Sequence, residues 1–244
     1  MDVRDLGRIT YEDALEVQLA LVEKRVQGYI PDTLALAEHF PVLTLGRLAE
    51  ERSIIDRVYF EERRVPVVCS NRGGKATYHS PGQLVLYPVV DLGEKKKDVA
   101  FYIDFLERTV ARSLRRLGVP AERDGSRRGV WSGGRKIAFI GIALKRWVAF
   151  HGVSININND LEAFSRILPC GESGIKVISV RQVLGHSVDM TRTKEIFTRQ
   201  FVSDLQSEYS CETRSIEYHA IRGEVKKSGG GNHGVEAAGT FRKE

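Results

Sequence analysis

The chain has 244 residues, of which 42% are hydrophobic and 28% charged, with a net charge of +5 at pH 7. These values are ordinary for globular proteins, and the length predicts one large domain or two small ones. The amino terminus lacks the apolar stretch of a signal peptide, and no run approaches the ~20 apolar residues of a membrane span, so we expect a cytoplasmic protein with no membrane partner.

The first half of the chain is expected to begin with a helix over residues 10–28. Apolar residues recur there at helical spacing, Thr10 resembles an N-terminal cap, and Gly28 suits the position after the last turn. Pro88 interrupts a later apolar run, which is typical of an edge strand or a bulge. Extended or β-prone segments are predicted at residues 34–46, 65–70 and 84–90.

The second half of the chain is expected to combine two helices with a hairpin. Apolar positions predict helices over residues 98–117 and 193–209. Two β-prone runs, 137–144 and 147–157, are separated by Lys145-Arg146, which favours an antiparallel hairpin. Interspersed helices and strands with such a hairpin favour an α+β fold with a mixed sheet, in a single domain, over a doubly wound parallel sheet.

The end of the chain is expected to lie outside that domain. From about residue 224 it contains Ser-Gly-Gly-Gly-Asn-His-Gly and few apolar residues, a composition that disfavours a packed core. We therefore expect a domain over residues 1–223 and a disordered tail over 224–244.

Basic residues gather in three clusters, which allow two interpretations. The first is an ordinary solvated surface, and the second is a docking face for an acidic partner, either nucleic acid or an acidic carrier protein. No aromatic-rich single-strand motif or basic helix stripe favours nucleic acid. The clusters are Lys95, Lys96 and Lys97; Arg112, Arg115 and Arg116; and Arg123, Arg127 and Arg128.

A glycine-rich segment over residues 71–83 lies between two β-prone runs, so we expect a long loop. It combines glycines with Arg72, Lys75, Tyr78 and His79. Glycines let a backbone approach a ligand closely, and the polar side chains can orient a carbonyl or a phosphate. The segment is not a Walker loop, because Gly-Lys-Ser/Thr at the required spacing is absent.

Lys136 lies where a turn becomes an apolar strand, within residues 129–141. A lysine at a strand end usually extends its ammonium to water. If the ammonium lies in a cleft instead, it can stabilise a neighbouring thiolate or shuttle a proton.

Cysteines are few, and one of them stands in a distinctive setting. Cys69, Cys170 and Cys211 lie far apart, without a Cys-x-x-Cys or His-x-x-x-His pair, which disfavours a disulfide framework and a structural zinc site. Most lone cysteines are buried small hydrophobes. Pro169 and Gly171 bracket Cys170, however, which favours a tight loop that presents a reactive thiol.

These segments together resemble the lipoyl(octanoyl) transferase family, also called lipoate–protein ligase B, over about residues 10–205. Several motifs in series carry the resemblance. They are Glu38-His-x-Pro-Val-x-Thr-x-Gly, Arg72-Gly-Gly-x-x-Thr-Tyr-His-x-Pro-Gly-Gln, Gly129-Val-Trp with Lys136-Ile-Ala-x-Ile-Gly, His151-Gly-x-x-x-Asn, and Pro169-Cys-Gly.

The resemblance implies an acyltransferase on the catalytic-domain fold of biotin and lipoate ligases. Members take an octanoyl group from octanoyl-acyl carrier protein and attach it to a lysine of lipoyl domains. The expected acceptors are the lipoyl domains of 2-oxoacid dehydrogenase E2 subunits and the glycine cleavage H protein. No cofactor, metal, ATP or nucleic acid is expected to take part, and a monomer is the default expectation.

The resemblance also implies the site. Cys170 matches the cysteine that carries the acyl thioester, and Lys136 matches the lysine that lowers the pKa of that cysteine and relays protons. One departure is Ser80, where the family usually has glycine, so the loop geometry there is open. The positions matching substrate-binding residues are Arg72, Gly73, Gly74, Lys75, Ala76, Thr77, Tyr78, His79, Phe139, Ile140, Gly141, Gly152, Val153 and Ser154.

Three alternatives remain. An ATP-dependent lipoate or biotin ligase on the same fold would make an acyl-adenylate, and Cys170 would be incidental. A non-catalytic protein could bind carrier proteins or lipoyl domains without transferring anything. A cysteine hydrolase would release the acyl group to water.

Overall fold

The computed structural model of this chain describes residues 1–168 and 174–224, with side chains described as far as residue 209. The chain divides into two compact units, Met1–Asp204 and Leu205–Glu244. The two sheets, the pocket and Lys136 belong to the first unit.

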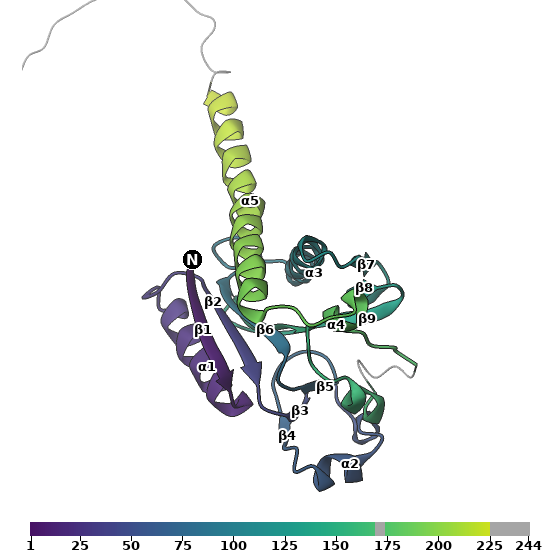
Figure 1. Cartoon of the computed structure of the whole chain (residues 1–244). Coiled ribbons are helices and arrows are strands. Elements are labelled where there is room, and N and C mark those ends of the chain that lie inside the picture. Colours follow the sequence, from purple (N-terminus) through teal and green to yellow (C-terminus); the bar gives the residue numbers. More distant parts are fainter. Residues whose placement is uncertain (169–173, 225–244) are drawn as a thin grey trace, which may run out of the picture. The chain divides into compact units, whose positions relative to one another are not determined.

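A seven-stranded sheet forms the framework of the first unit (Figure 1). β1 runs parallel to β2, and the other neighbouring strands are antiparallel, so the sheet is mixed. In spatial order the strands are β1 (Asp2–Ile9), β2 (Thr33–His39), β6 (Gln83–Asp91), β10 (Val148–Asn156), β9 (Arg135–Lys145), β8 (Arg127–Ser132) and β7 (Glu122–Asp124).

A three-stranded sheet in the order β4 (Val67–Cys69), β3 (Val42–Leu45) and β5 (Ala76–His79) accompanies the larger one. Its apolar side chains join those of α2 (Arg57–Glu62) and of a short 3₁₀ helix, Glu162–Arg166, in one core cluster. Another 3₁₀ turn, Glu51–Ser53, precedes α2. Phe139 of β9 belongs to the same cluster, so the small sheet is anchored against the large one.

Helices cover both faces of the large sheet. Val85 and Tyr87 of β6 pack in a cluster with Ala14 of α1 (Tyr11–Val26). Because successive residues of a strand point to opposite faces, Leu84 and Leu86 point away from α1, and they too are buried. The remaining helices are α3 (Val99–Arg116), α4 (Val180–Leu184) and α5 (Met190–Glu224).

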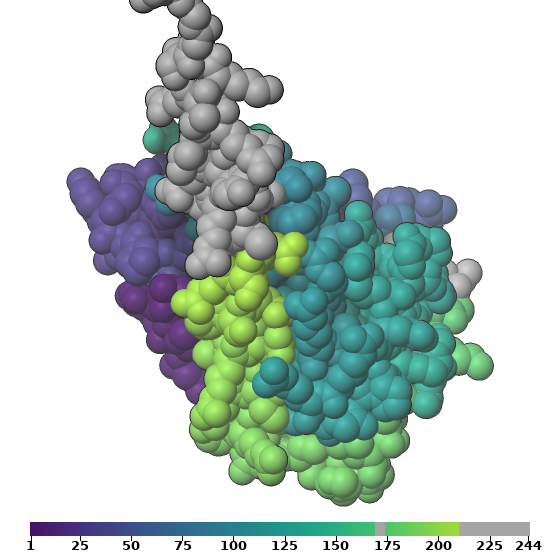
Figure 2. Space-filling model, turned by 90° about the horizontal axis from the view of Figure 1, so that it is seen from above, coloured from purple at the N-terminus to yellow at the C-terminus, as the bar shows by residue number. Residues whose placement is uncertain are grey.

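The first turns of α5 lie between β1 and α3 (Figure 2). Lys194 forms an ion pair with Asp5 of β1 at 3.0 Å. On the other side, Asp204 pairs with Arg112 of α3 at 2.9 Å and accepts a hydrogen bond from Thr109. No helix in the described part of the chain is long and apolar enough to cross a membrane.

The expected mixed α+β fold is confirmed, as are the helices over 10–28 and 98–117 and the hairpin of β9 and β10. The hairpin turn lies one residue later than expected, at Arg146 and Trp147, which both have positive φ. The third expected helix, α5, begins at Met190 and extends to Glu224 rather than ending at 209. The expected tail lies almost wholly outside the described residues.

Two expectations about loops and edges were wrong. The segment 71–83 is not one long loop, because β5 forms within it and pairs with β3. Pro88 is not on an edge strand, since β6 lies between β2 and β10. It stands opposite Leu34 of β2, at a point where the pairing of β6 with β10 is interrupted. A proline can occupy that position because it has no N–H to donate.

The basic clusters are largely occupied by internal contacts. Arg123 and Arg128 both pair with Asp104, and Arg127 pairs with Asp124. Lys95 likewise pairs with Asp32, at 2.7 Å. Carboxylates therefore balance the charges of Lys95 and of the Arg123, Arg127 and Arg128 cluster, which weakens the interpretation of these residues as a docking face.

Candidate active site

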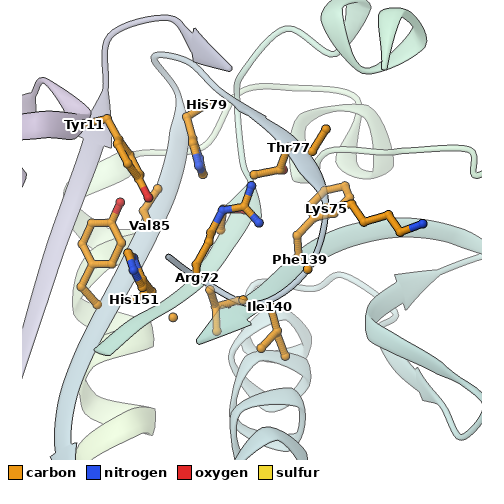
Figure 3. A pocket seen from close by; sticks show the side chains of 16 residues that line it. Tyr11, Arg72, Lys75, Thr77, His79, Val85, Phe139, Ile140 and His151 are labelled. Carbon is orange, nitrogen blue, oxygen red and sulfur yellow. The ribbon is translucent and has the colours of Figure 1, made fainter. Parts of the chain in front are cut away.

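A pocket is lined by residues of both sheets and by Tyr11 of α1 (Figure 3). Arg72 stands between two groups of labelled side chains. Tyr11, Val85 and His151 lie on one side of it, and Lys75 and Phe139 on the other. All the predicted substrate-binding residues except Gly73 and Tyr78 line this pocket.

Glycines let the Arg72–Lys75 segment lie directly against β9. The amide of Gly73 donates to the carbonyl of Ile142 at 2.8 Å. A Cβ on Gly141 would stand 2.7 Å from the carbonyl oxygen of Gly73, and a Cβ on Gly46 would stand 2.4 Å from that of Gly74. Such distances leave no room for a side chain, so the close approach requires these glycines.

The guanidinium of Arg72 is buried and held by hydrogen bonds to Thr44 of β3. It donates to the backbone carbonyl of Thr44 at 2.7 Å and to the Thr44 hydroxyl at 2.8 Å and 3.2 Å. A positive charge fixed in this place disfavours further positive charge nearby. It thereby contributes to the lowered pKa values of His79 and His151.

His79 is a neutral member of a hydrogen-bonded chain. Burial, with the neighbouring His39 adding to it, lowers the pKa of His79 well below its ordinary value. Its Nδ1 lies 2.7 Å from Oε1 of Gln83, whose amide nitrogen donates to Asn156 at 2.9 Å. Since that Gln83 oxygen is an acceptor, His79 carries its proton on Nδ1. This series of hydrogen bonds fixes the orientation of β5 relative to β10.

His151 has a backbone conformation that is unusual for a residue with a side chain. Its φ is +56°, which falls in the left-handed region that only a few per cent of residues other than glycine adopt, with asparagine, aspartate and histidine enriched among them. The ring stacks on Phe150 at 4.8 Å, and Nε2 lies 2.6 Å from the side-chain oxygen of Asn71. Burial and the positive charge of Arg72 lower the pKa of His151 to about 3.

Two buried polar atoms among the pocket-lining residues have no hydrogen-bond partner, Nδ1 of His151 and Oγ1 of Thr77. Because Nε2 of His151 donates to Asn71, Nδ1 bears a lone pair and is an acceptor. The Thr77 hydroxyl can donate. Buried polar groups are normally satisfied in folded proteins, so these two atoms mark places where a ligand or water would complete the structure.

Tyr11 and Tyr87 close the pocket on the side of α1 and β6, and both side chains are held in place. The Tyr11 hydroxyl shares a hydrogen bond of 2.7 Å with Ser70, and that of Tyr87 shares one of 2.6 Å with Nε2 of His39. Burial raises the pKa of both phenols, so they stay neutral. At this end of the pocket, hydrogen bonds therefore fix the positions of both lining side chains.

Lys136 is buried rather than extended to water, with 2% of its surface exposed. Its Nζ donates to the backbone carbonyl of Arg128 at 2.7 Å. The same nitrogen lies 5.1 Å from the ring centroid of Phe139, which lines the pocket, and 5.3 Å from that of Trp131. The expectation of an ordinary strand-end lysine is wrong, and the ammonium lies beside the Phe139 side of the pocket.

Cys170 lies outside the described residues, so its predicted role stays a prediction. Described residues on either side of it form backbone hydrogen bonds with other segments of the chain. Before it, the amide of Leu168 donates to Ser53 at 2.9 Å. After it, the carbonyl of Lys176 accepts from the amide of Lys136 at 2.8 Å. Residues 176 and 178 therefore lie against the backbone of Lys136.

Two predicted residues lie outside the pocket lining, and four lining residues were not predicted. Gly73 serves to dock the loop, as described above, and Tyr78 packs in the core of the small sheet, where burial raises its pKa to about 12. His151 begins the motif His151-Gly-x-x-x-Asn, and that motif could have identified it as a site residue. The four lining residues absent from the prediction are Tyr11, Val85, Tyr87 and His151.

Ser80 has an ordinary backbone conformation. It is not among the described residues other than glycine that have positive φ, so a Cβ at this position causes no backbone strain. Gly82 is the residue in the turn that needs to be glycine, with φ +87° and only 2.8 Å from its Cβ position to the amide nitrogen of Asn159. In the described residues no group of three or more His, Cys, Asp or Glu side chains could hold a metal ion.

Comparison with known proteins places the chain in a family. Residues 10–202 match the family described as the lipoyl protein ligase A/B catalytic domain. An octanoyltransferase of Syntrophotalea carbinolica is 39% identical over 207 residues, which are 85% of this chain and 95% of that protein. An octanoyltransferase of Solibacter usitatus is 42% identical over 82% of this chain and 90% of that protein.

Solved structures show the same fold at lower identity. A lipoate-protein ligase A bound with ATP superposes with a TM-score of 0.68 at 19% identity, covering 84% of this chain and 86% of that one. The family match extends over most of the chain, including the pocket and Lys136. This chain therefore belongs to the lipoyl protein ligase A/B catalytic-domain family.

Proposed function

We propose that this chain is an octanoyltransferase that moves an octanoyl group from acyl carrier protein to a lysine of a lipoyl domain through a thioester on Cys170. The observation that carries the proposal is the buried Lys136 ammonium, 5.1 Å from the pocket-lining ring of Phe139, in a chain whose near full-length relatives are named octanoyltransferase. The proposed catalytic domain is residues 1–223.

The first half of the reaction needs a thiolate. The Cys170 thiolate attacks the thioester carbonyl of the donor and a new sulfur–carbon bond forms. The donor's own sulfur–carbon bond breaks, and the carrier protein leaves as a thiolate that takes a proton from the Lys136 ammonium. A positive charge near a cysteine increases the fraction present as thiolate, which is the role proposed for Lys136. Because the donor thioester is already activated, no ATP is required.

The second half of the reaction transfers the acyl group to nitrogen. The neutral amine of the acceptor lysine attacks the Cys170 thioester, an amide forms, the Cys170 thiolate leaves, and the nitrogen loses a proton. Two groups are candidates to accept that proton, His79 and the Lys136 amine, which is neutral after protonating the departing carrier thiolate. Burial keeps the pKa of His79 far below its ordinary value, so His79 is a poor proton acceptor, and we assign the relay to Lys136.

The pocket suits an acyl chain. Val85, Phe139, Ile140 and Val153 contribute apolar lining, and each methylene buried there contributes about 0.8 kcal/mol. The unpartnered hydroxyl of Thr77 is placed to donate to a carbonyl oxygen. The proposed pocket therefore binds both the apolar chain and its polar head.

The proposed partners are octanoyl-acyl carrier protein as donor and lipoyl domains as acceptors, including those of 2-oxoacid dehydrogenase E2 subunits and of the glycine cleavage H protein. Thiols stay reduced in the cytoplasm, which suits a free thiol nucleophile, so the proposed place of action is the cytoplasm. No cofactor takes part in the proposed reaction.

A transfer assay separates this proposal from an ATP-dependent ligase. Octanoyl-carrier protein and a lipoyl domain are incubated with the chain without ATP, and the lipoyl domain is examined by mass spectrometry. We expect one octanoyl group on the lipoyl domain. Modification that requires free octanoate and ATP would favour the ligase, and release of free octanoate in excess of transfer would favour a hydrolase.

A further inference from the structure

Glu107 is a buried carboxylate on the face of α3 that packs against the sheet. Its side chain is only 3% exposed, and its neighbours in the helix, Leu106 and Val110, are apolar and buried. A charge in such a place is costly unless it is paired and hydrogen-bonded. Glu107 is not among the residues with an assigned role in the reaction above, so its position calls for an explanation.

The carboxylate of Glu107 and the ammonium of Lys136 are joined by a single peptide group. Oε1 of Glu107 accepts the amide hydrogen of Gly129 at 2.8 Å. The carbonyl of the same peptide group, that of Arg128, accepts from Nζ of Lys136 at 2.7 Å. Hydrogen bonds in series polarise one another, so a carboxylate on the N–H side makes the carbonyl a stronger acceptor.

This peptide group also contacts Lys136 closely. Gly129 has φ +108°, and a Cβ built on it would stand 2.6 Å from Cε of Lys136 and 2.6 Å from the carbonyl oxygen of Ala138. Glycine is therefore required at this position. The lysine side chain lies against the backbone that Glu107 holds, so a shift of that backbone would move the ammonium.

The charge of Glu107 is balanced by the guanidinium groups of two arginines. Oε2 of Glu107 lies 3.3 Å from Nε of Arg123 and 3.8 Å from Nη1 of Arg128. Asp104, one turn earlier on α3, pairs with both arginines. The two carboxylate oxygens of Glu107 thus have separate tasks, since one binds the peptide group and the other faces the arginines.

We propose that Glu107 is a positioning residue for acyl transfer, which acts by holding the Arg128–Gly129 peptide group that fixes the Lys136 ammonium. The inference rests on the proposed role of Lys136. It assigns to α3, a helix that contributes no residue to the pocket lining, a direct part in the geometry of the reaction.

Three variants of Glu107 test this role. Glu107→Gln keeps an oxygen acceptor for Gly129. Glu107→Asp keeps the charge near the arginines but withdraws the acceptor by one methylene, and Glu107→Ala removes both. Because misplacing a catalytic group by about 1 Å can cost about 100-fold in rate, we expect kcat to fall about 100-fold in the alanine variant. We expect a loss of at least about tenfold in the aspartate variant and retention within about threefold in the glutamine variant.

Asp204→Ala is the matched control, since Asp204 is another buried carboxylate that pairs with α3, through Thr109 and Arg112. It is expected to lower the thermal midpoint as Glu107→Ala does, without lowering kcat. The KM for octanoyl-carrier protein is expected to stay within about threefold in all these variants, because the pocket is unchanged.

A double variant shows whether Glu107 acts through Lys136. Once Lys136→Ala has removed the ammonium, adding Glu107→Ala is expected to cost no further rate. The inference is overturned if the two losses multiply, if Glu107→Gln loses as much as Glu107→Ala, or if a folded Glu107→Asp keeps full kcat. If Lys136→Ala itself keeps full transfer, the proposed role of Lys136 fails instead, which is a separate result.

Discussion

At the residue scale, Gly141 decides how closely the loop that carries Arg72 approaches β9. A Cβ there would stand 2.7 Å from the carbonyl oxygen of Gly73. We expect Gly141→Ala to displace the loop and lower kcat/KM for the octanoyl donor by about tenfold or more, because groups aligned by that loop lose their geometry. Gly125→Ala is the control, since nothing lies within 4 Å of its Cβ position. Equal activity of the two variants in the transfer assay would contradict this account.

His151 links stability to pH. Its pKa is about 3 in the folded protein and about 6.5 in an unfolded chain. The unfolded state therefore binds the proton first, so stability is complete above about pH 6.5 and falls as the pH drops toward 3. The lowered pKa values of His39 and His79 act with the same sign.

Replacing His151 should flatten that dependence. Asparagine tolerates positive φ, and His151→Asn is expected to reduce the slope of unfolding free energy against pH, between about pH 4.5 and 6, by about 1.4 kcal/mol per pH unit. Denaturant titrations at several pH values measure the slope, with the exposed His186→Asn as control. A slope unchanged from the parent would show that His151 is already protonated in the folded state.

The residues of the site were predictable from sequence only where they belong to motifs. Glycines beside Arg72 and at 141 and 152 mark close backbone approach, and the structure brings all these segments together at the pocket. Tyr11 comes from a helix about sixty residues before that loop, and its position depends on how α1 packs on the sheet. Glu107 carried a signal that was overlooked, a charge on the apolar face of a helix.

At the element scale, β6 contributes a specificity determinant. Val85 is buried and lines the pocket near Tyr11 (Figure 3). We expect Val85→Phe to occupy part of the acyl pocket and to shift preference from octanoyl toward hexanoyl donors by about tenfold, since two methylenes contribute about 1.6 kcal/mol. Val85→Ala should shift preference toward decanoyl donors.

A competition among hexanoyl-, octanoyl- and decanoyl-carrier protein measures that shift. The readout is the mass of the modified lipoyl domain. Both variants are compared with the parent at equal folded concentration. An unchanged product distribution in both would place the acyl chain elsewhere than in this pocket.

Elements were predictable from sequence where local signals were complete. α1 has the Thr10 cap, a hydrogen bond from the amide of Asp13 to the Thr10 hydroxyl, and apolar spacing. β1 has no such signal, because it is an edge strand with mostly exposed, charged residues. β5 depends on pairing with β3, more than thirty residues away, and a glycine-rich sequence around it predicts a loop instead.

At the scale of the whole molecule, the family match ends at residue 202, and the pocket and Lys136 lie within the unit Met1–Asp204. We therefore expect a chain truncated after Glu224 to keep its thermal midpoint and its rate of octanoyl transfer. Both are measured against the full chain. A loss of transfer with an unchanged midpoint would assign the last twenty residues a role in the reaction.

The central claim is a covalent octanoyl-enzyme on Cys170 that forms without ATP. Intact-mass spectrometry of the chain after brief exposure to octanoyl-carrier protein, with no acceptor present, tests it most directly. We expect the parent to gain the mass of one octanoyl group, Cys170→Ser to gain none, and Lys136→Ala to gain it much more slowly. An octanoyl adduct that persists in Cys170→Ser, or transfer to a lipoyl domain by that variant, would contradict the account.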